Sequence, residues 1–237
     1  MLAADERVIM VSGANRGIGR AVARVLYDRG YRLSLGARDP AALSAACSTF
    51  DPERVLQQPY EARDPAAAEA WVTATAGRFQ RIDGLVNAAG ILMQVGLEED
   101  AEERYEALWA VNVMGPLRLT RLALPHLRAS GRGRIVNLAS LSGKRVAGGN
   151  AGYAMSKFAV VALSHATRQA GWEDGVRVTA LCPGYVATDM VAEVSDPPAE
   201  AMIQPADLAE LVAMVLALPN TASVPELPVN CRLEDTV

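Results

Sequence analysis

Short apolar runs alternate along the chain with longer segments in which apolar residues recur at helical spacing. Residues 7–11 form the first such run, and residues 18–28 then repeat apolar positions three and four apart until Gly30. Further strands are expected over residues 31–36, 54–58, 82–87, 134–139, 176–182 and 226–231, and further helices over residues 40–47, 66–79, 101–127, 152–172 and 205–218. This alternation predicts an α/β fold with a doubly wound parallel sheet that carries helices on both faces.

Proline positions and chain length predict how these elements are divided. Pro116 and Pro125 lie in the helical pattern of residues 101–127, where we expect them to kink or bound it. Beyond residue 183 the pattern loosens, and residues 195–198 (Ser-Asp-Pro-Pro) interrupt it before the last helix. No repeat, low-complexity tract or change in composition separates parts of the 237 residues. We therefore expect a single domain over residues 1–237.

Composition and charge narrow the functional classes. The content of 51% hydrophobic and 21% charged residues is ordinary for a soluble globular protein. The net charge of −4 gives no basic excess, which argues against a nucleic-acid partner. The three cysteines fall in no metal-ligand pattern, so we expect no metal and a reducing compartment. Neither an export signal nor an apolar stretch of membrane-spanning length is visible, so we expect a cytoplasmic protein without membrane contact.

A glycine-rich turn follows the first predicted strand. Residues 12–19 read SGANRGIG, with glycines at Gly13, Gly17 and Gly19. Such a turn lets the backbone approach a pyrophosphate closely and directs the first amides of the next helix at the anion. Glycines alone would also fit an ordinary helix start, but the strand before them and the helix after them favour dinucleotide binding.

The spacing of these glycines, GxxxGxG, resembles that of the short-chain dehydrogenase/reductase family. Three further family motifs follow in order: Asn87-Ala88-Ala89-Gly90, Tyr153-Ala154-Met155-Ser156-Lys157 and Pro183-Gly184. The resemblance runs from Val8 to about Asp189 and continues less distinctly to the end of the chain. It implies a Rossmann-type domain with a seven-stranded parallel sheet and a nicotinamide cofactor.

The end of the second strand indicates which nicotinamide cofactor is used. An acidic side chain there would hold the ribose 2′-hydroxyl of NAD, whereas a basic one accommodates the 2′-phosphate of NADP. Ala37 stands at the family's acidic position, Arg38 follows it, and Arg16 lies in the glycine turn, as in family members that prefer NADP. Two guanidinium groups suit a phosphate, so we expect NADP(H), although Asp39 could partly offset Arg38. An NAD-dependent alcohol dehydrogenase is an alternative.

The resemblance also implies which residues contact the cofactor. Glu61, which precedes Ala62, stands where the family usually has an aspartate near the adenine edge. The residues expected to contact NADP(H) are Gly13, Asn15, Arg16, Gly17, Ile18, Gly19, Arg38, Glu61, Ala62, Asn87, Ala88, Gly90, Tyr153, Lys157, Pro183, Gly184, Val186 and Thr188.

Carbonyl reduction needs a proton donor and fixed polarity around the carbonyl oxygen, and four residues match the family's catalytic set. Tyr153 would donate the proton, and Lys157, four residues later on the same helix face, would lower the pKa of the phenol. Ser140, thirteen residues before Tyr153, would hydrogen-bond the substrate oxygen; Ser142 lies at the wrong spacing. Asn112 matches the asparagine that organises a water relay to the lysine in related enzymes.

The sequence indicates the type of reaction more closely than it indicates the substrate. Residues 92–95, 141–146, 185 and 190–202 are expected to wall its site, and their apolar character indicates a hydrophobic or medium-sized ketone or aldehyde. Lys144 and Arg145 could attract an anionic substrate such as a 3-oxoacyl thioester, but a charged pair after a strand is usually a solvated loop. His126 and His165 match no family site.

Two further expectations concern partners and competing functions. The long apolar helices over residues 101–127 and 152–172 favour a homodimer or homotetramer, as in the family. A catalytically idle NADP-binding regulator is the alternative from another functional class. The presence of Ser140, Tyr153, Lys157 and Asn112 argues against it, because a pure sensor needs no acid–base tyrosine.

Overall fold

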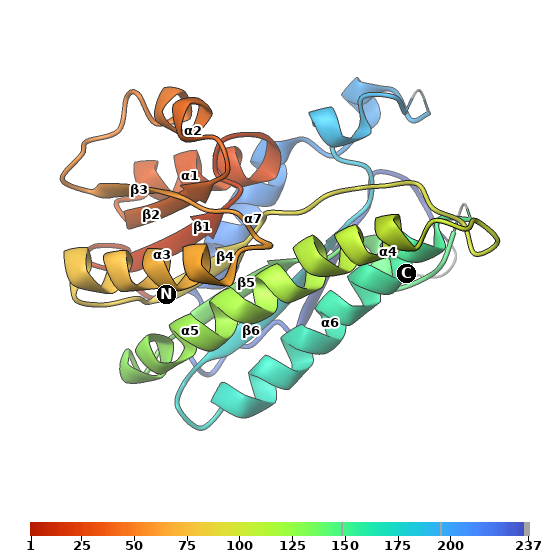
Figure 1. The fold of residues 1–237 in the computed structure, drawn as a ribbon. Coiled ribbons are helices and arrows are strands. Elements are labelled where there is room, and N and C mark those ends of the chain that lie inside the picture. The colour runs from red at the N-terminus through yellow and green to blue at the C-terminus, as the bar shows by residue number, and fades with distance from the viewer. Residues whose placement is uncertain (148, 195, 235–237) are drawn as a thin grey trace.

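The strands form one sheet in the computed structural model, which describes residues 1–147, 149–194 and 196–234 (Figure 1). The sheet has seven parallel strands in the order β3-β2-β1-β4-β5-β6-β7. Their bounds are β1 (Val8–Ser12), β2 (Arg32–Ala37), β3 (Val55–Pro59), β4 (Gly84–Asn87), β5 (Arg134–Leu138), β6 (Arg177–Pro183) and β7 (Glu226–Val229). The order reverses direction between β1 and β4, as in a doubly wound fold.

Helices cover both faces of this sheet. Their bounds are α1 (Gly17–Asp28), α2 (Pro40–Ala46), α3 (Pro65–Phe79), α4 (Glu102–Trp109), α5 (Gly115–Ala129), α6 (Ala151–Gly171) and α7 (Pro205–Ala217). Figure 1 shows α3, α5 and α6 on one face and α1 and α7 on the other. No helix in the described part of the chain combines the length and the apolar character needed to cross a membrane.

The first strand explains why the sheet needs cover on both sides. Successive side chains of a strand point to opposite faces. Ile9 and Val11 are buried in the core under α1 and α7, whereas Met10 is buried in the core under α3 and α5. Because both faces are covered, the strand is a continuous apolar run without polar alternation. This is the pattern on which the sequence-based prediction of a parallel sheet depends.

The expected elements are all present, and their ends differ from the predicted ones by one or two residues, except between residues 101 and 127. That segment divides into α4, a π-helical turn (Ala110–Met114) and α5. The amide of Gly115 donates to the carbonyl of Ala110, five residues earlier. Pro116 has no N–H to donate to the carbonyl of Asn112, so an α-helical bond is impossible there.

The second proline of this segment behaves differently. Pro125 lies inside α5, which continues to Ala129, so it neither ends the helix nor bounds it as expected. Pro125 and Arg121 are both exposed, so the hydrogen bond that proline removes from the Arg121 carbonyl lies on the solvent side of the helix. Of the predicted break at residues 195–198, residue 195 lies outside the described residues, and a short 3₁₀ turn (Ala199–Ala201) follows the break.

Gly36 on β2 gives a test of the packing between the sheet and α3. A methyl group at Gly36 would lie 2.7 Å from the ring of Trp71, which is fully buried and donates to Ser34 Oγ at 2.8 Å. Because the indole has no room to move, we expect Gly36→Ala to lower the free energy of unfolding by about 1–3 kcal/mol. Urea denaturation measures the change.

The matched control is Gly77→Ala on α3. No atom lies within 4 Å of the methyl group that this change adds. Alanine is the better helix former, so the control should raise the free energy of unfolding by about 0.5–1 kcal/mol. Equal effects of the two changes would contradict the packing described for Gly36.

Candidate active site

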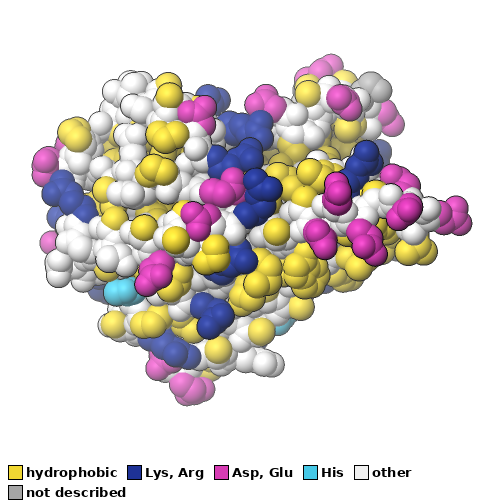
Figure 2. All heavy atoms as spheres, in the orientation of Figure 1, with side chains coloured by type: hydrophobic (Ala, Val, Ile, Leu, Met, Phe, Trp, Pro, Cys, Tyr) yellow, Lys and Arg dark blue, Asp and Glu magenta, His cyan; other side chains and the backbone are white. Residues whose placement is uncertain are grey.

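A cleft opens at the carboxyl ends of β1 and β4, where the strand order reverses. Ligands of open α/β sheets bind at this position. The cavity has a volume of about 610 Å³. Its walls come from the turn after β1, the ends of β2 and β3, the segment after β4 and the segment after β6. Figure 2 shows the surface hollowed there, with basic side chains gathered along the hollow.

The glycine turn forms one wall of the cavity and is closely packed. Gly13 and Gly17 have φ angles of +68° and +52°, which residues other than glycine rarely adopt. A methyl group at Gly19 would lie 2.2 Å from the carbonyl oxygen of Gly13. Helix α1 then begins with no side-chain cap and no acidic residue in its first turn. Its first amides are therefore free to bind an anion.

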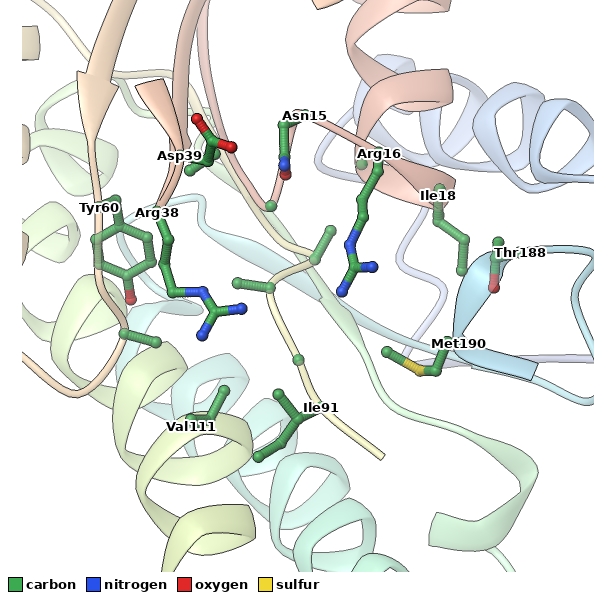
Figure 3. A pocket seen from close by; sticks show the side chains of 18 of the residues that line it. Asn15, Arg16, Ile18, Arg38, Asp39, Tyr60, Ile91, Val111, Thr188 and Met190 are labelled. Carbon is green, nitrogen blue, oxygen red and sulfur yellow. The ribbon is translucent and has the colours of Figure 1, made fainter. Parts of the chain in front are cut away.

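Two arginines face the cavity from different elements. Arg16 comes from the glycine turn and Arg38 from the end of β2, and Figure 3 shows both guanidinium groups pointing into the cavity. The carboxylate of Asp39 makes no ion pair with Arg38 among the described residues and instead caps α2, where it accepts from Ala41 N and Ala42 N at 2.9 and 3.0 Å. Arg16 has an exposed carboxylate 3.9 Å away, on Asp189. Two guanidinium groups that face one cavity fit a phosphate group.

Most of the residues expected to contact the cofactor line this cavity: Gly13, Asn15, Arg16, Gly17, Ile18, Gly19, Arg38, Glu61, Ala62, Ala88, Gly90 and Thr188. Asn87 lies outside the wall, because its buried amide turns inward and donates to Asn137 Oδ1 at 2.8 Å. Val186 is also buried and pairs with Ile203 in an isolated bridge. Pro183 and Gly184 lie beside Ser140 and β7 rather than in the cavity wall.

Other cavity residues were not indicated by the sequence. Tyr60, Ile91 and Val111 line the cavity, and Figure 3 shows their side chains around it. They belong to no motif. Their position in the chain could have indicated them, because Tyr60 and Ile91 follow the carboxyl ends of β3 and β4, where ligands of such sheets bind. Met190, expected near the substrate, lines the same cavity.

Ser140, Tyr153 and Lys157 come together beside this cleft, where β5 ends and α6 begins. Lys157 Nζ lies 5.5 Å from the centre of the Tyr153 ring and donates to the carbonyl of Leu138 at 2.8 Å. Ser140 Oγ accepts from Ser142 N at 3.1 Å. The three side chains therefore form one polar group at the carboxyl end of β5.

Burial controls the protonation of this group. It raises the pKa of the Tyr153 phenol to about 12, although a hydrogen bond with Ser140 opposes the rise. Burial also lowers the pKa of Lys157 to about 8. The lowered tyrosine pKa expected from the sequence is therefore not found in this structure, because loss of solvation outweighs the hydrogen bond with Ser140. At neutral pH Tyr153 is protonated and Lys157 is mostly cationic.

Asn112 links this polar group to the cleft. In the π-helical turn, its Oδ1 accepts from Ile91 N at 2.9 Å, and its Nδ2 donates to Ile91 O and Ser156 Oγ at 3.0 and 3.1 Å. A methyl group at Gly90 would lie 3.3 Å from Asn112 Oδ1 and 3.9 Å from Lys157 Nζ. Gly90, Asn112 and Lys157 therefore meet at the inner end of the cavity.

Comparison with known proteins agrees with this geometry. Residues 7–199 match the model of the short chain dehydrogenase family. The chain belongs to the short-chain dehydrogenase/reductase family. The Rossmann-type fold and the seven-stranded parallel sheet expected from the resemblance are confirmed.

Relatives of this short-chain dehydrogenase/reductase include two agropine synthesis reductases of Rhizobium rhizogenes, each 44% identical over 230 residues. The alignments cover 96% and 97% of this chain but 53% of each relative, so the chain spans about half the length of those proteins. An uncharacterized oxidoreductase of Staphylococcus saprophyticus is 30% identical over 97% of this chain and 99% of its own length.

Solved structures of the family have the same fold. A short-chain dehydrogenase/reductase from Brucella melitensis superposes with a TM-score of 0.90 at 28% identity, covering 98% of this chain and 99% of that one. An alcohol dehydrogenase from the archaeon Thermococcus sibiricus, complexed with 5-hydroxy-NADP, gives a TM-score of 0.86 at 31% identity, covering 94% and 95%.

The buried lysine predicts a pH dependence of stability. The pKa of Lys157 is about 8 in the folded protein, against an ordinary value of 10.5. As the pH falls from 10.5 to 8, the unfolded chain takes up this proton and the folded protein does not, so stability is lost. Relative to Lys157→Met, we expect the free energy of unfolding to rise by up to about 3 kcal/mol between pH 8 and 10.5. Urea denaturation across this range measures the difference.

Nuclear magnetic resonance provides the control, because the chain has two lysines, Lys144 and Lys157. With lysine labelled at Cε, one of the two signals should titrate near pH 8 and should vanish in Lys157→Met. Parallel stability curves for the two proteins, together with the absence of any lysine signal that titrates near pH 8, would contradict the pKa assigned to Lys157.

Proposed function

We propose that this chain is an NADP(H)-dependent oxidoreductase that interconverts a carbonyl compound and the corresponding alcohol. The observation that carries this proposal is the grouping of Ser140, Tyr153 and Lys157 beside a cleft that presents two arginines. Neither the polar group nor the pair of arginines indicates this function as well alone. A regulator would need the arginines, but it has no use for a protonated tyrosine next to a lysine.

The cofactor would bind along the cleft from the glycine turn to Lys157. Arg16 and Arg38 would hold the 2′-phosphate, because guanidinium groups form paired hydrogen bonds with phosphate oxygens. The uncapped first amides of α1 would bind the pyrophosphate. Glu61 and Ala62 would lie at the adenine end, and Thr188 would lie on the opposite wall. When bound, the nicotinamide supplies or accepts the hydride.

Tyr153 would act as the general acid in the direction of reduction. Its raised pKa keeps the phenol protonated at neutral pH, so it can donate a proton to the substrate oxygen. Ser140 would donate a hydrogen bond to the same oxygen. The cationic Lys157 would stabilise the phenolate that remains, and this stabilisation is worth most in a buried site. In the direction of oxidation Tyr153 would accept the proton.

The chain's relatives support the reductive direction. The two agropine synthesis reductases, at 44% identity, are named for a reduction. The substrate we propose is a ketone or an aldehyde, since the segments expected to wall its site are largely apolar.

We also propose that the protein forms a homodimer or homotetramer. Trp109 on α4 and Met155 and Phe158 on α6 are exposed to solvent, although they are large and apolar. The two helices contact one another, so these side chains lie on neighbouring elements. An exposed apolar surface of this kind is typical of a subunit interface.

Replacement of the proposed acid tests the mechanism. Tyr153→Phe removes one hydroxyl, and we expect the kcat for reduction of an aldehyde by NADPH to fall by about 10²–10⁴-fold. Binding of NADPH, measured by its fluorescence, should change little. Tyr27→Phe is the control, since it removes a hydroxyl that accepts from Asp51 N at 2.9 Å, away from the cleft. Equal rates for wild type and Tyr153→Phe would refute the mechanism.

Replacement of the arginines tests the choice of cofactor. Arg16→Ser and Arg38→Ser should each weaken NADPH binding by about 10–100-fold, the effect of a hydrogen bond to a charged group, and should leave NADH binding nearly unchanged. The control is Arg20→Ser, because Arg20 is exposed on α1 and is not among the residues that line the cavity. Fluorescence titration with both cofactors measures the ratio, and a wild-type preference for NADH would contradict the proposal.

A further inference from the structure

Residues 230–234, which we call the strap, follow β7 and contact both segments that flank Ser140. The strap starts where Gly184 N donates to Val229 O at 2.8 Å. A methyl group at Gly184 would lie 2.9 Å from Asn230 Oδ1 and 3.2 Å from the side chain of Leu141. The strap therefore lies against the turn after β6, and Leu141, the residue that follows Ser140, lies beside the same turn. This turn and Leu141 belong to the expected walls of the substrate site.

Charged side chains fix the strap to these two walls. The carboxylate of Glu234 accepts from the guanidinium of Arg145, and their side chains are only 13% and 20% exposed. Arg145 is itself held in the turn after Ser140, where its amide donates to Leu141 O at 3.1 Å. On the other wall, Arg232 lies 5.2 Å from the centre of the Tyr185 ring and 3.9 Å from Glu234.

Two neighbouring cations on this side of the site, Lys144 and Arg145, each pair with a carboxylate. Lys144 pairs with Glu226, whose second oxygen lies 2.6 Å from His165 Nε2. Burial alone would raise the pKa of Glu234, but its contacts with Arg145, Asn230 and Arg232 hold the pKa below its ordinary value. Lys144 and Arg145 therefore each pair with a carboxylate of this chain. The sequence left open whether they form a solvated loop or attract an anionic substrate, and this pairing fits neither alternative.

We propose that Glu234 determines substrate specificity by pairing with Arg145, so that this arginine offers no free charge and the site discriminates against carboxylated or phosphorylated carbonyl compounds. The proposal rests on the proposed function of the chain. Its physical basis is that a partly buried arginine with its own carboxylate has no charge left for a second anion. Without that carboxylate, the arginine would be left unpaired and would bind an anionic group of the substrate.

Two aldehydes that differ in charge test this role: methyl 4-formylbenzoate and 4-formylbenzoate. The wild type should prefer the ester. In Glu234→Gln, the ratio of kcat/KM for the acid to kcat/KM for the ester should rise at least tenfold. A merely structural role of Glu234 would lower both values together and would leave the ratio unchanged.

Further variants isolate the charge of Arg145. Adding Arg145→Met to Glu234→Gln should return the ratio to the wild-type value, and Glu234→Asp, which keeps the carboxylate, should stay close to it. The matched control is Glu53→Gln, which removes the carboxylate partner of Arg78, 3.2 Å away on α3. Glu53→Gln should leave the ratio unchanged.

Binding measurements separate this inference from the proposed function. If the wild type reduces neither aldehyde, the proposed function fails for these substrates. Calorimetric titration of the same proteins with 4-formylbenzoate still decides the role of Glu234: at least tenfold tighter binding to Glu234→Gln than to the wild type supports it. An unchanged ratio of kcat/KM, or equal binding of the acid to both folded proteins, would overturn it.

Discussion

The site depends on the close approach of α6 to the turn that follows β5. A methyl group at Gly143 would lie 2.6 Å from the carbonyl oxygen of Lys157, so only glycine fits between this turn and the helix. On the other side of the turn, Lys157 Nζ donates to the carbonyl of Leu138. These two contacts hold Ser140 against the first turns of α6. The proposed catalytic group follows from them, since Tyr153 lies one helical turn before Lys157.

The same approach explains the protonation of the site. Packing of α6 on the end of β5 buries the ammonium of Lys157 and half-buries Tyr153. Each group is then driven toward its neutral form, which raises the pKa of Tyr153 and lowers the pKa of Lys157. The sequence correctly suggested that Tyr153 and Lys157 share a helix face, because a spacing of four residues is a local property. The expected direction of the tyrosine pKa shift was wrong, because burial depends on elements far away in the chain.

The same distinction holds for the rest of the chain. The strands, helices and glycine turn were predictable because their signals are local: apolar period, proline at a helix start and glycine at a turn. The walls of the cleft were predictable only where a motif marked them, which left out Tyr60, Ile91 and Val111. The pairing of Arg145 with Glu234 joins residues 89 positions apart, and no pattern in the sequence connects them.

The break between α4 and α5 has a consequence for the proposed chemistry. Donation of a proton leaves Tyr153 as a phenolate, which must regain a proton before the next reduction. The side chain of Asn112 is fully engaged with Ile91 and Ser156. Its backbone carbonyl, however, has no α-helical donor, because residue 116 is proline. The water relay proposed for Asn112 would therefore use this backbone carbonyl rather than the side-chain amide.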